Sequence, residues 1–329
     1  MTRILSTHAY AHHPPAWAER VDVLDRRELS RRELFGQIVR RAAAYDALIL
    51  NGSIGAGELY LDLVAGLVVR RTRRRPPAML FTDCSWQLGA RSADRAAMRA
   101  GIRALDGPRV RYCVRSRAEL ELFPRTWGVD PRHVAFTSYA HTVTPDELAV
   151  PATTDGGVFA GGNSLRDYDT LLDAVHGLDV PVRIETKVIP PERLAGLPAH
   201  VDVSAIRSHD AFVDGLRRAA VVVTPILPAV NRAAGLDTYL SAMALGKVVI
   251  VTESPGVSDY VEHGRTGLVV PPADAAALRD AIAWSLDPAH ADEAAAIAAA
   301  AREAAHTRFT YVQYVESLLR IADEAVATT

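Results

Sequence analysis

Short runs of β-branched and other apolar residues alternate with longer stretches of helical periodicity along most of this chain. The strand-like runs cover residues 47–50, 78–82, 109–114, 133–137, 158–160, 182–188, 201–206, 221–224, 248–252 and 268–270. Helices are predicted over residues 58–75, 92–105, 117–123, 169–176, 212–219, 236–245, 274–286 and 291–305. Strands that alternate with helices form parallel sheets, because the crossover helices cover both sheet faces. The order of elements therefore predicts a doubly wound α/β protein.

The chain is long enough for two domains. Its 329 residues exceed what one hydrophobic core usually supports. Residues 144–157 lack an apolar period and contain prolines, threonines, acids and glycines, which is typical of a linker. We therefore expect Rossmann-like domains over residues 1–150 and 151–306, facing each other across a cleft at the carboxyl ends of their sheets. A closing amphipathic helix over residues 309–325 is long enough to pack across a neighbouring domain.

Composition argues against several classes of protein. Hydrophobic residues make up 49% and charged residues 23% of the chain, a balance typical of soluble globular proteins. The 37 basic and 39 acidic residues leave a formal net charge of -2, which argues against nucleic-acid binding. Cys84 and Cys113 are too few for a disulfide framework or a cysteine-rich zinc site. No apolar run is long enough to span a bilayer or serve as a signal peptide, so we expect a soluble, cytoplasmic protein.

A glycine pair follows the strand predicted over residues 158–160. Gly161 and Gly162 are followed by Arg166 just before a helix. Glycines let a ligand approach the backbone closely, and exposed N–H groups beside a guanidinium suit an anion such as a diphosphate. The alternative is a tight strand-to-helix turn with a solvated Arg166. Taken alone, the glycine pair favours that alternative.

Two further segments follow in the second half of the chain. The buried strand over residues 221–224 leads through an irregular loop to Gly235, where the N–H groups of the next helix can point at a ligand. Asp237 could instead cap that helix and occupy one of those donors. The segment over residues 247–274 combines a strand, a glycine turn and the sequence HGRTGLVVPP, a combination that chance rarely produces.

Together, these three segments resemble the nucleotide-sugar-binding half of a glycosyltransferase with the GT-B fold, and most of all the retaining glycosyltransferases of family 4 (group 1). The matching features are the glycine turn with Arg166, residues 235–250, Gly256 with Asp259, and residues 264–274. The resemblance extends over about residues 158–286 and is weak before them. It implies that the last helix, over residues 307–329, packs back onto the first domain.

The resemblance implies a site for a nucleotide-sugar donor. Arg166 would act catalytically by pairing with the diphosphate, and the amides of residues 235–238 would stabilise the charge on the leaving group. The base would lie near Lys187 and residues 206–207. No metal or other cofactor is expected. The donor-binding residues implied are Gly161, Gly162, Arg166, Gly235, Leu236, Asp237, Thr238 and Ser241.

The chain departs from this family at two acidic positions. The family commonly carries two glutamates separated by seven residues, of which the first contacts sugar hydroxyls and the second the ribose. Here the second position is Ser241, and the first falls near Arg232 and Ala233. Either the donor sugar lacks hydroxyl groups at the expected place, as a deoxysugar does, or the site is weakened.

The first domain would then bind a small-molecule or lipid-linked acceptor. His8, Asn51, Gly52 and Asp83 lie in predicted loops at strand ends, and a carboxylate such as Asp83 would contact the acceptor hydroxyl as a catalytic residue. Asp83 is equally suited to a turn or a helix cap. Nearby, His12 and His13 extend the first loop.

The arginines among residues 70–75 end an apolar helix. They could contact anionic lipid at the membrane surface or bind an acidic acceptor. Alternatively, they could complement the helix dipole, which is the interpretation that we favour.

Three functions are compatible with these residues. The first is a retaining glycosyltransferase. The second, motivated by the missing glutamates, is a non-catalytic GT-B protein that binds a nucleotide sugar or supports a partner enzyme. A sugar-nucleotide epimerase ranks last, because no acid pair suited to proton abstraction stands out.

Overall fold

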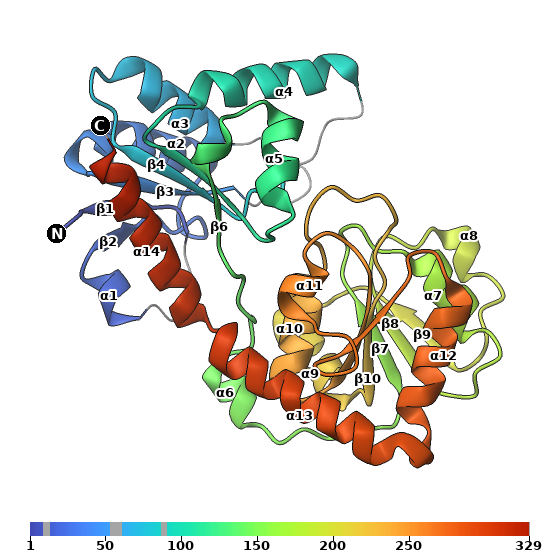
Figure 1. Cartoon of the computed structure of the whole chain (residues 1–329). Coiled ribbons are helices and arrows are strands. Elements are labelled where there is room, and N and C mark those ends of the chain that lie inside the picture. Colours follow the sequence, from blue (N-terminus) through green and yellow to red (C-terminus); the bar gives the residue numbers. More distant parts are fainter. Residues whose placement is uncertain (9–13, 53–60, 87–90, 329) are drawn as a thin grey trace. The chain divides into compact units, whose positions relative to one another are not determined.

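The computed structural model describes residues 1–8, 14–52, 61–86 and 91–328. These residues form two compact units (Figure 1). Unit 1 contains Met1–Ser138 together with Val312–Thr329, and unit 2 contains Tyr139–Tyr311. The chain therefore leaves unit 1, completes unit 2 and returns to unit 1 with its last helix.

Unit 1 is built on a six-stranded parallel sheet. The strand order is β2-β1-β3-β4-β5-β6, and every pairing is parallel. Its strands are β1 (Ile4–Ser6), β2 (Val21–Val23), β3 (Ala47–Asn51), β4 (Ala78–Thr82), β5 (Val110–Val114) and β6 (Val134–Phe136). The side chains of β3 and β4 are almost all apolar and buried, as expected for strands that are covered on both faces.

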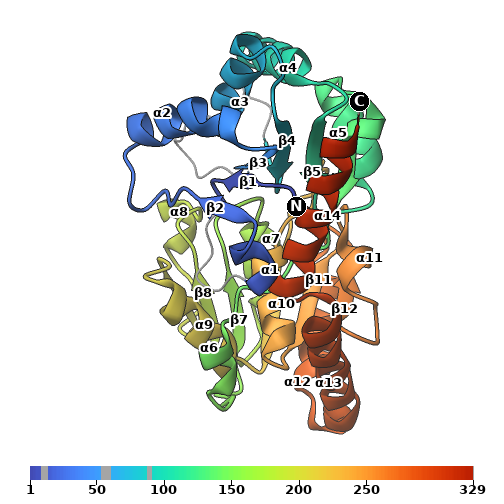
Figure 2. The same cartoon turned by 90° about the vertical axis from the view of Figure 1, so that its left-hand side faces the viewer.

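Helices cover both faces of this sheet. They are α1 (Pro15–Ala18), α2 (Arg31–Arg41), α3 (Leu61–Thr72), α4 (Ser92–Leu105), α5 (Glu119–Trp127) and α14 (Tyr311–Ala327), with short 3-10 turns at Ala42–Ala44 and Pro131–His133. Helices α2 to α5 share one hydrophobic cluster with alternate strand residues such as Leu48 and Phe81 (Figure 2). Helix α14 is bound to the first strands through Asp323, whose carboxylate accepts hydrogen bonds from Thr2 and Arg20.

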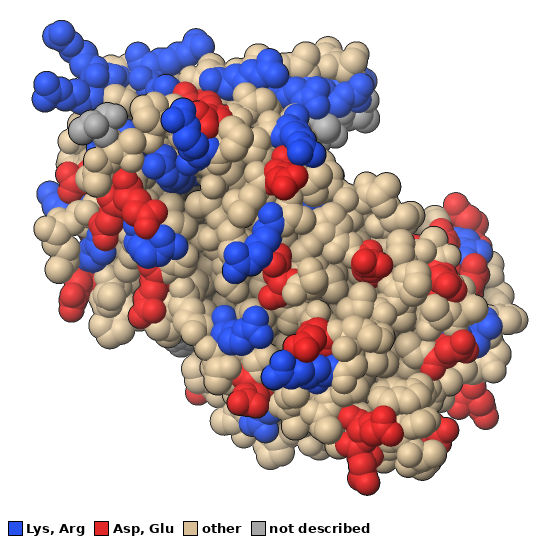
Figure 3. Space-filling model, in the orientation of Figure 1, with Lys and Arg blue, Asp and Glu red and all other residues tan. Residues whose placement is uncertain are grey.

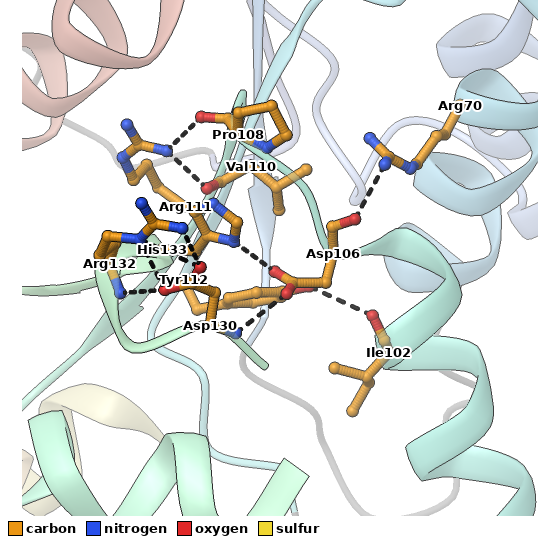
Figure 4. A network of polar contacts seen from close by, with 10 residues as sticks. All are labelled: Arg70, Ile102, Asp106, Pro108, Val110, Arg111, Tyr112, Asp130, Arg132 and His133. Atoms are coloured by element: carbon orange, nitrogen blue, oxygen red, sulfur yellow. Dashed lines mark hydrogen bonds and ion pairs between the residues drawn. The ribbon is translucent and has the colours of Figure 1, made fainter. Parts of the chain in front are cut away.

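A polar network at the end of α4 involves the first arginine of the 70–75 run. The carboxylate of Asp106 accepts the N–H of Asp130 at 3.0 Å and lies 2.8 Å from Nδ1 of His133. Arg70 donates to the main-chain oxygen of Asp106 at 2.8 Å (Figure 4). Arg73 similarly donates to a main-chain oxygen of α2. These two arginines therefore stabilise unit 1.

Unit 2 contains a second six-stranded parallel sheet. Its order is β12-β11-β10-β7-β8-β9. The strands are β7 (Val158–Gly161), β8 (Val182–Glu185), β9 (Val201–Ser204), β10 (Val221–Thr224), β11 (Val248–Thr252) and β12 (Leu268–Val270). The side chains of β7, β10 and β11 are all buried.

The helices of unit 2 also lie on both sides of their sheet. They are α6 (Pro145–Ala149), α7 (Tyr168–Val175), α8 (Pro191–Leu194), α9 (His209–Arg218), α10 (Leu236–Ala244), α11 (Val257–Tyr260), α12 (Ala275–Leu286) and α13 (Ala291–Arg308), with a 3-10 turn at Pro288–His290. Helices α7 and α12 bury Leu171 and Ile282 in one cluster with alternate strand residues. Helix α13 packs beside α10, and its last turn positions His306 against Ala244.

This architecture confirms the predicted fold class, and most predicted strands lie within a residue or two of those observed. One prediction differs in detail. Residues 144–157, predicted as a linker, begin with the short helix α6, because Thr144 and Glu147 form a reciprocal N-terminal capping box. Residues 139–150 group with unit 2, so the division between the units falls after Ser138.

Charge is divided unequally between the two units. Unit 1 contains 24 basic and 17 acidic residues, a net charge of +7, whereas unit 2 contains 13 and 22, a net charge of -9. Figure 3 shows basic side chains gathered over the part of unit 1 that carries α3 and α4. Over the described ranges, every helix is too short or too polar to traverse a bilayer.

Candidate functional site

The glycine turn after β7 is held in a conformation that suits glycine. Gly162 has φ of +117°, and its N–H donates to the main-chain oxygen of Glu185 at the end of the neighbouring strand β8. Thr186 and Tyr168 both donate from their hydroxyl groups to the oxygen of Gly162. Asn163 accepts the N–H of Lys187 at 2.8 Å. The turn is therefore fixed by the segment that follows β8, where the sequence predicts the nucleotide base.

Arg166 folds back over this turn. Its Nε donates to the oxygen of Gly161 at 3.2 Å, and its Nη1 donates to the oxygen of Ser164 at 2.7 Å. Its Nη2 donates to Oγ1 of Thr238 at 3.1 Å. Among the described residues Arg166 forms no ion pair, and burial lowers its pKa from the usual value. A half-buried cation whose hydrogen-bond acceptors are all neutral oxygens suits the binding of an anion.

The first turn of α10 lies at the other end of that contact. Thr238 is buried, and its hydroxyl group donates to the oxygen of Gly161 at 3.2 Å. Gly235 begins the helix at φ of +82°, where a Cβ atom would lie 2.5 Å from Cγ2 of Thr224. Within the described chain, the amides of residues 235–237 donate to no acceptor, so the helix presents free donors beside Arg166.

Asp237 does not cap α10. The N-terminal cap is Gly235, without a side-chain hydrogen bond, and the exposed carboxylate of Asp237 instead accepts the hydroxyl group of Tyr139 at 2.9 Å. The capping alternative for Asp237 is therefore wrong. The first turn of α10 therefore has no side-chain cap among the described residues.

Arg232, which the sequence did not single out for ligand binding, also contacts the turn after β7. It is 9% exposed and lies in the loop between β10 and α10. Its Nη2 donates to Oγ of Ser164 at 3.0 Å, and its Nη1 donates to the oxygen of Ala233 at 3.3 Å. The one sequence feature that could have drawn attention to Arg232 is its position two residues before Ala234 and three before Gly235.

Ser241 is buried one turn and a half into α10. Its hydroxyl group accepts the N–H of Thr142 at 3.3 Å and lies 3.1 Å from the hydroxyl group of Thr142. In the structure, Ser241 therefore anchors the 139–144 segment to α10. Contact of Ser241 with a ribose stays a prediction, and it requires that Thr142 move or share the hydroxyl group.

The third segment that resembles the glycosyltransferase family, residues 247–274, lines a cavity of about 660 Å³ within unit 2. The cavity lies between this segment and α13. Gly256 begins α11 at φ of +89°. His263 accepts the N–H of Val269 at its Nδ1, 3.0 Å away, which closes the turn after α11.

The residues predicted for the acceptor lie at the carboxyl ends of neighbouring strands in the unit 1 sheet. His8, the pair Asn51 and Gly52, and Asp83 follow β1, β3 and β4, which are neighbours in the sheet. Asp83 has φ of +50° and accepts the hydroxyl group of Tyr314 at 3.0 Å. The ring of Tyr314 also lies 5.6 Å from that of His8, between ring centres.

A buried carboxylate holds the residues at the ends of β1 and β3 in place. Asp62 accepts the N–H of Asn51 at 2.7 Å and also binds Thr7 and Arg26. Burial raises the pKa of Asp62, and Arg26 opposes that effect. Neither Asp62 nor Tyr314 was predicted from the sequence, because their partners lie far away along the chain.

Several predicted positions lie outside the described residues. They are His12 and His13 of the first loop and residues 58–60 of the helix predicted over residues 58–75.

Comparison with known proteins gives three findings. Residues 186–287 match the family model described as glycosyl transferases group 1. Among proteins with curated descriptions, none matches this sequence. Many solved structures share the fold across both units.

Three of those structures cover nearly the whole chain. HepE from Anabaena, in complex with UDP and glucose, has a TM-score of 0.67 and 15% identity over 98% of this chain and 100% of its own. A glycosyltransferase from Rickettsia africae has a TM-score of 0.63 and 12% identity over 100% and 91%. Sucrose-phosphate synthase from Thermosynechococcus elongatus has a TM-score of 0.64 and 19% identity over 91% and 80%.

At these identities the structures show the fold alone, while the family match covers the part of unit 2 that runs from the end of β8 through α12. The chain is thus similar to glycosyltransferases in both respects. The family match is thus limited to residues 186–287, and the solved structures show that the chain has the GT-B fold.

Proposed function

We propose that this protein transfers a sugar from a nucleotide-sugar donor to a hydroxyl group of an acceptor, with retention of the anomeric configuration. The observation that carries the proposal is the hydrogen bond of Arg166 to Thr238, which places a guanidinium that forms no ion pair among the described residues beside the first turn of α10. A diphosphate bound there would be held by charge-assisted hydrogen bonds. HepE, which has the same fold, binds UDP and glucose.

In this proposal the chemistry depends on stabilising the leaving group. As the bond between the sugar and the diphosphate breaks, negative charge grows on the diphosphate oxygen and positive charge on the sugar ring. Arg166 and the amides of residues 235–237 are placed in advance, so little reorganisation is needed when the charge appears. We assign this role to the protein's own groups and not to a metal, and we therefore expect activity to survive a chelator.

The test is binding of UDP, GDP and ADP by calorimetry. Replacing Arg166 with Ala should weaken the preferred nucleoside diphosphate by about 10- to 100-fold, as the loss of a charged hydrogen bond implies. Arg302→Gln removes an exposed cation from α13 of the same unit and should leave affinity unchanged. Equal affinity of wild type and Arg166→Ala would exclude Arg166 from the site.

Transfer itself is tested separately, because a binding protein would pass the first test. Ala233 and Ser241 stand where the family carries acids, and the contact between Ser241 and Thr142 favours a non-catalytic protein as the second candidate. Donor consumption with a panel of nucleotide sugars and acceptors separates the two, and the anomeric configuration of any product, read by NMR, tests retention. Tight binding without turnover of any donor would support the second candidate.

We further propose that unit 1 receives an anionic or lipid-linked acceptor at an anionic surface. The proposal is supported by the +7 net charge of unit 1 and by the exposure of Arg71, Arg74 and Arg75 at the end of α3. The test is sedimentation with vesicles that contain phosphatidylglycerol. The wild type should sediment with the vesicles, whereas a variant in which Arg71, Arg74 and Arg75 are all replaced by Gln should stay in the supernatant. Equal sedimentation of both would refute this part of the proposal.

A further inference from the structure

Glu185 ends strand β8 with a buried carboxyl group. Its side chain is 4% exposed, and its Oε2 atom accepts no hydrogen bond from any residue that the structure describes. Buried oxygen atoms in folded proteins almost always have a hydrogen-bond partner. An acceptor that the protein itself leaves unused is therefore a candidate for contact with a ligand.

The strand register places Glu185 beside the proposed diphosphate site. Glu185 pairs with Gly161 of β7 on one side and with Ser204 of β9 on the other. Its main-chain oxygen accepts the N–H of Gly162, in the turn over which Arg166 folds. Neighbouring strands lie about 4.8 Å apart. Glu185 is therefore one strand away from that turn, on the side of β9.

The charged groups around Glu185 do not take up its oxygen atoms. Burial, the largest influence, raises the pKa of Glu185, whereas Arg183 and Arg207 oppose this effect and Asp202 and Asp214 add to it. Over the described ranges, none of these four forms an ion pair with Glu185. Hydrogen-bond donors supplied by a ligand would compensate for the hydration that the carboxylate loses on burial.

Apolar side chains follow the ends of the same two strands. Val188, three residues after Glu185, is 46% exposed, and Ile206, two residues after the end of β9, is partly buried. A nucleobase combines apolar faces with polar groups at its edge, whereas a ribose presents hydroxyl groups. An acceptor at depth with apolar side chains near it therefore favours a base over a ribose.

The chemistry of a carboxylate distinguishes between bases. An ionised carboxylate only accepts hydrogen bonds, and it can accept two side by side. Guanine presents two neighbouring donors, N1–H and the N2 amino group, at one edge. The single N–H at the corresponding edge of uracil lies between two carbonyl oxygens, and the amino group of adenine lies beside an acceptor nitrogen.

This difference indicates which nucleotide the protein uses. Resting on the proposed function, with the base near Lys187 and residues 206–207, we infer that the co-substrate is a guanine nucleotide sugar whose base is bound by Glu185. Both oxygen atoms of Glu185 then accept hydrogen bonds from the N1 and N2 groups of the base.

The experiment compares nucleoside diphosphates that differ at this edge of the base. GDP and IDP are identical except for the N2 amino group, which IDP lacks. Calorimetry with wild type should show GDP bound at least about 10-fold more tightly than IDP, because IDP loses one charge-assisted hydrogen bond, and UDP should bind more weakly than GDP. Glu185→Gln should reduce the preference for GDP over IDP to within about 3-fold, because an amide offers only one acceptor.

Two further variants and one measurement serve as controls. Asp179→Asn changes the charge of unit 2 equally at an exposed position before β8 and should keep the preference. Glu185→Asp withdraws the carboxylate by one methylene group, so it should reduce the preference and provides the test if Glu185→Gln does not fold. Urea unfolding without ligand should show Glu185→Gln at least as stable as wild type, because a buried charge without a hydrogen-bond partner is removed.

Several outcomes would overturn the inference while the proposed function stands. One is that wild type binds GDP no more tightly than IDP, UDP or ADP. Another is that Glu185→Gln, or Glu185→Asp in its place, keeps the preference or weakens GDP, IDP and UDP by the same factor, which would indicate contact with the ribose or a structural role. If wild type binds no nucleoside diphosphate, the proposed function fails as well.

Discussion

The stability of unit 2 should depend on the protonation of His141. The side chain lies beside His306, with 6.0 Å between ring centres, and its Nδ1 has no hydrogen-bond partner among the described residues. Burial, assisted by the neighbouring His306, lowers the pKa of His141 to about 4 from the ordinary 6.5. The folded protein therefore takes up this proton less readily than the unfolded chain does.

The sign and size of the effect follow from this difference. Above pH 6.5 His141 is neutral in both states and contributes nothing, whereas below that value only the unfolded chain gains the proton. The free energy of unfolding should then fall by about 2 kcal/mol between about pH 7.5 and pH 5, and the fall should level off below about pH 4.

Amide hydrogen exchange in peptides of α10 and α13 measures this, because it reports the opening of unit 2 alone. Wild type is compared with His141→Gln, which cannot be protonated in this range, and with His176→Gln at an exposed position of the same unit. As the pH falls from about 7.5 to 5, the free energy of opening of the wild type should fall by about 2 kcal/mol relative to that of His141→Gln. The free energy of opening of His176→Gln should follow that of the wild type. Parallel pH profiles for wild type and His141→Gln would refute the reasoning.

Two further predictions concern buried hydroxyl groups. Thr238→Val removes the hydroxyl group that accepts from Arg166 and donates to Gly161, so it should lower the free energy of unfolding by about 2 kcal/mol. Thr238→Ser keeps the hydroxyl group and should lower it by less than half as much. Urea unfolding measures both variants, and a Val variant as stable as wild type would count against the contact. Tyr314→Phe deprives Asp83 of a buried donor and should destabilise unit 1 by about 1.5 kcal/mol, measured by hydrogen exchange in β4, with unchanged protection in β10 expected as the internal control.

Periodicity was sufficient to predict most of the fold. Strands β7, β10 and β11 of unit 2 are short apolar runs, and each is buried on both faces. The first 46 residues gave no comparable signal, because β1 and β2 have three residues each and one side of β2 is exposed. Runs that short acquire their conformation from strand pairing, of β1 with β3 and of β2 with β1, which is a tertiary effect that local sequence does not encode.

The candidate site was predictable where its residues adjoin glycine turns. Arg166 and Gly235 belong to such turns, and the structure connects them through Thr238. Arg232 carried no local pattern, and Tyr314 reaches Asp83 from 231 positions away in the chain. Contacts of that range depend on how the sheet and helices pack, which a motif does not reveal.

Unit 1 is assembled from both ends of the chain, with α14 returning to it after unit 2. During synthesis α14 leaves the ribosome after all of unit 2, so the sheet of unit 1 must remain without its Tyr314 contact until then. Unit 2 has all of its residues outside the ribosome earlier. A premature stop before α14 would therefore release a protein in which unit 2 is complete and unit 1 lacks the helix that carries Tyr314.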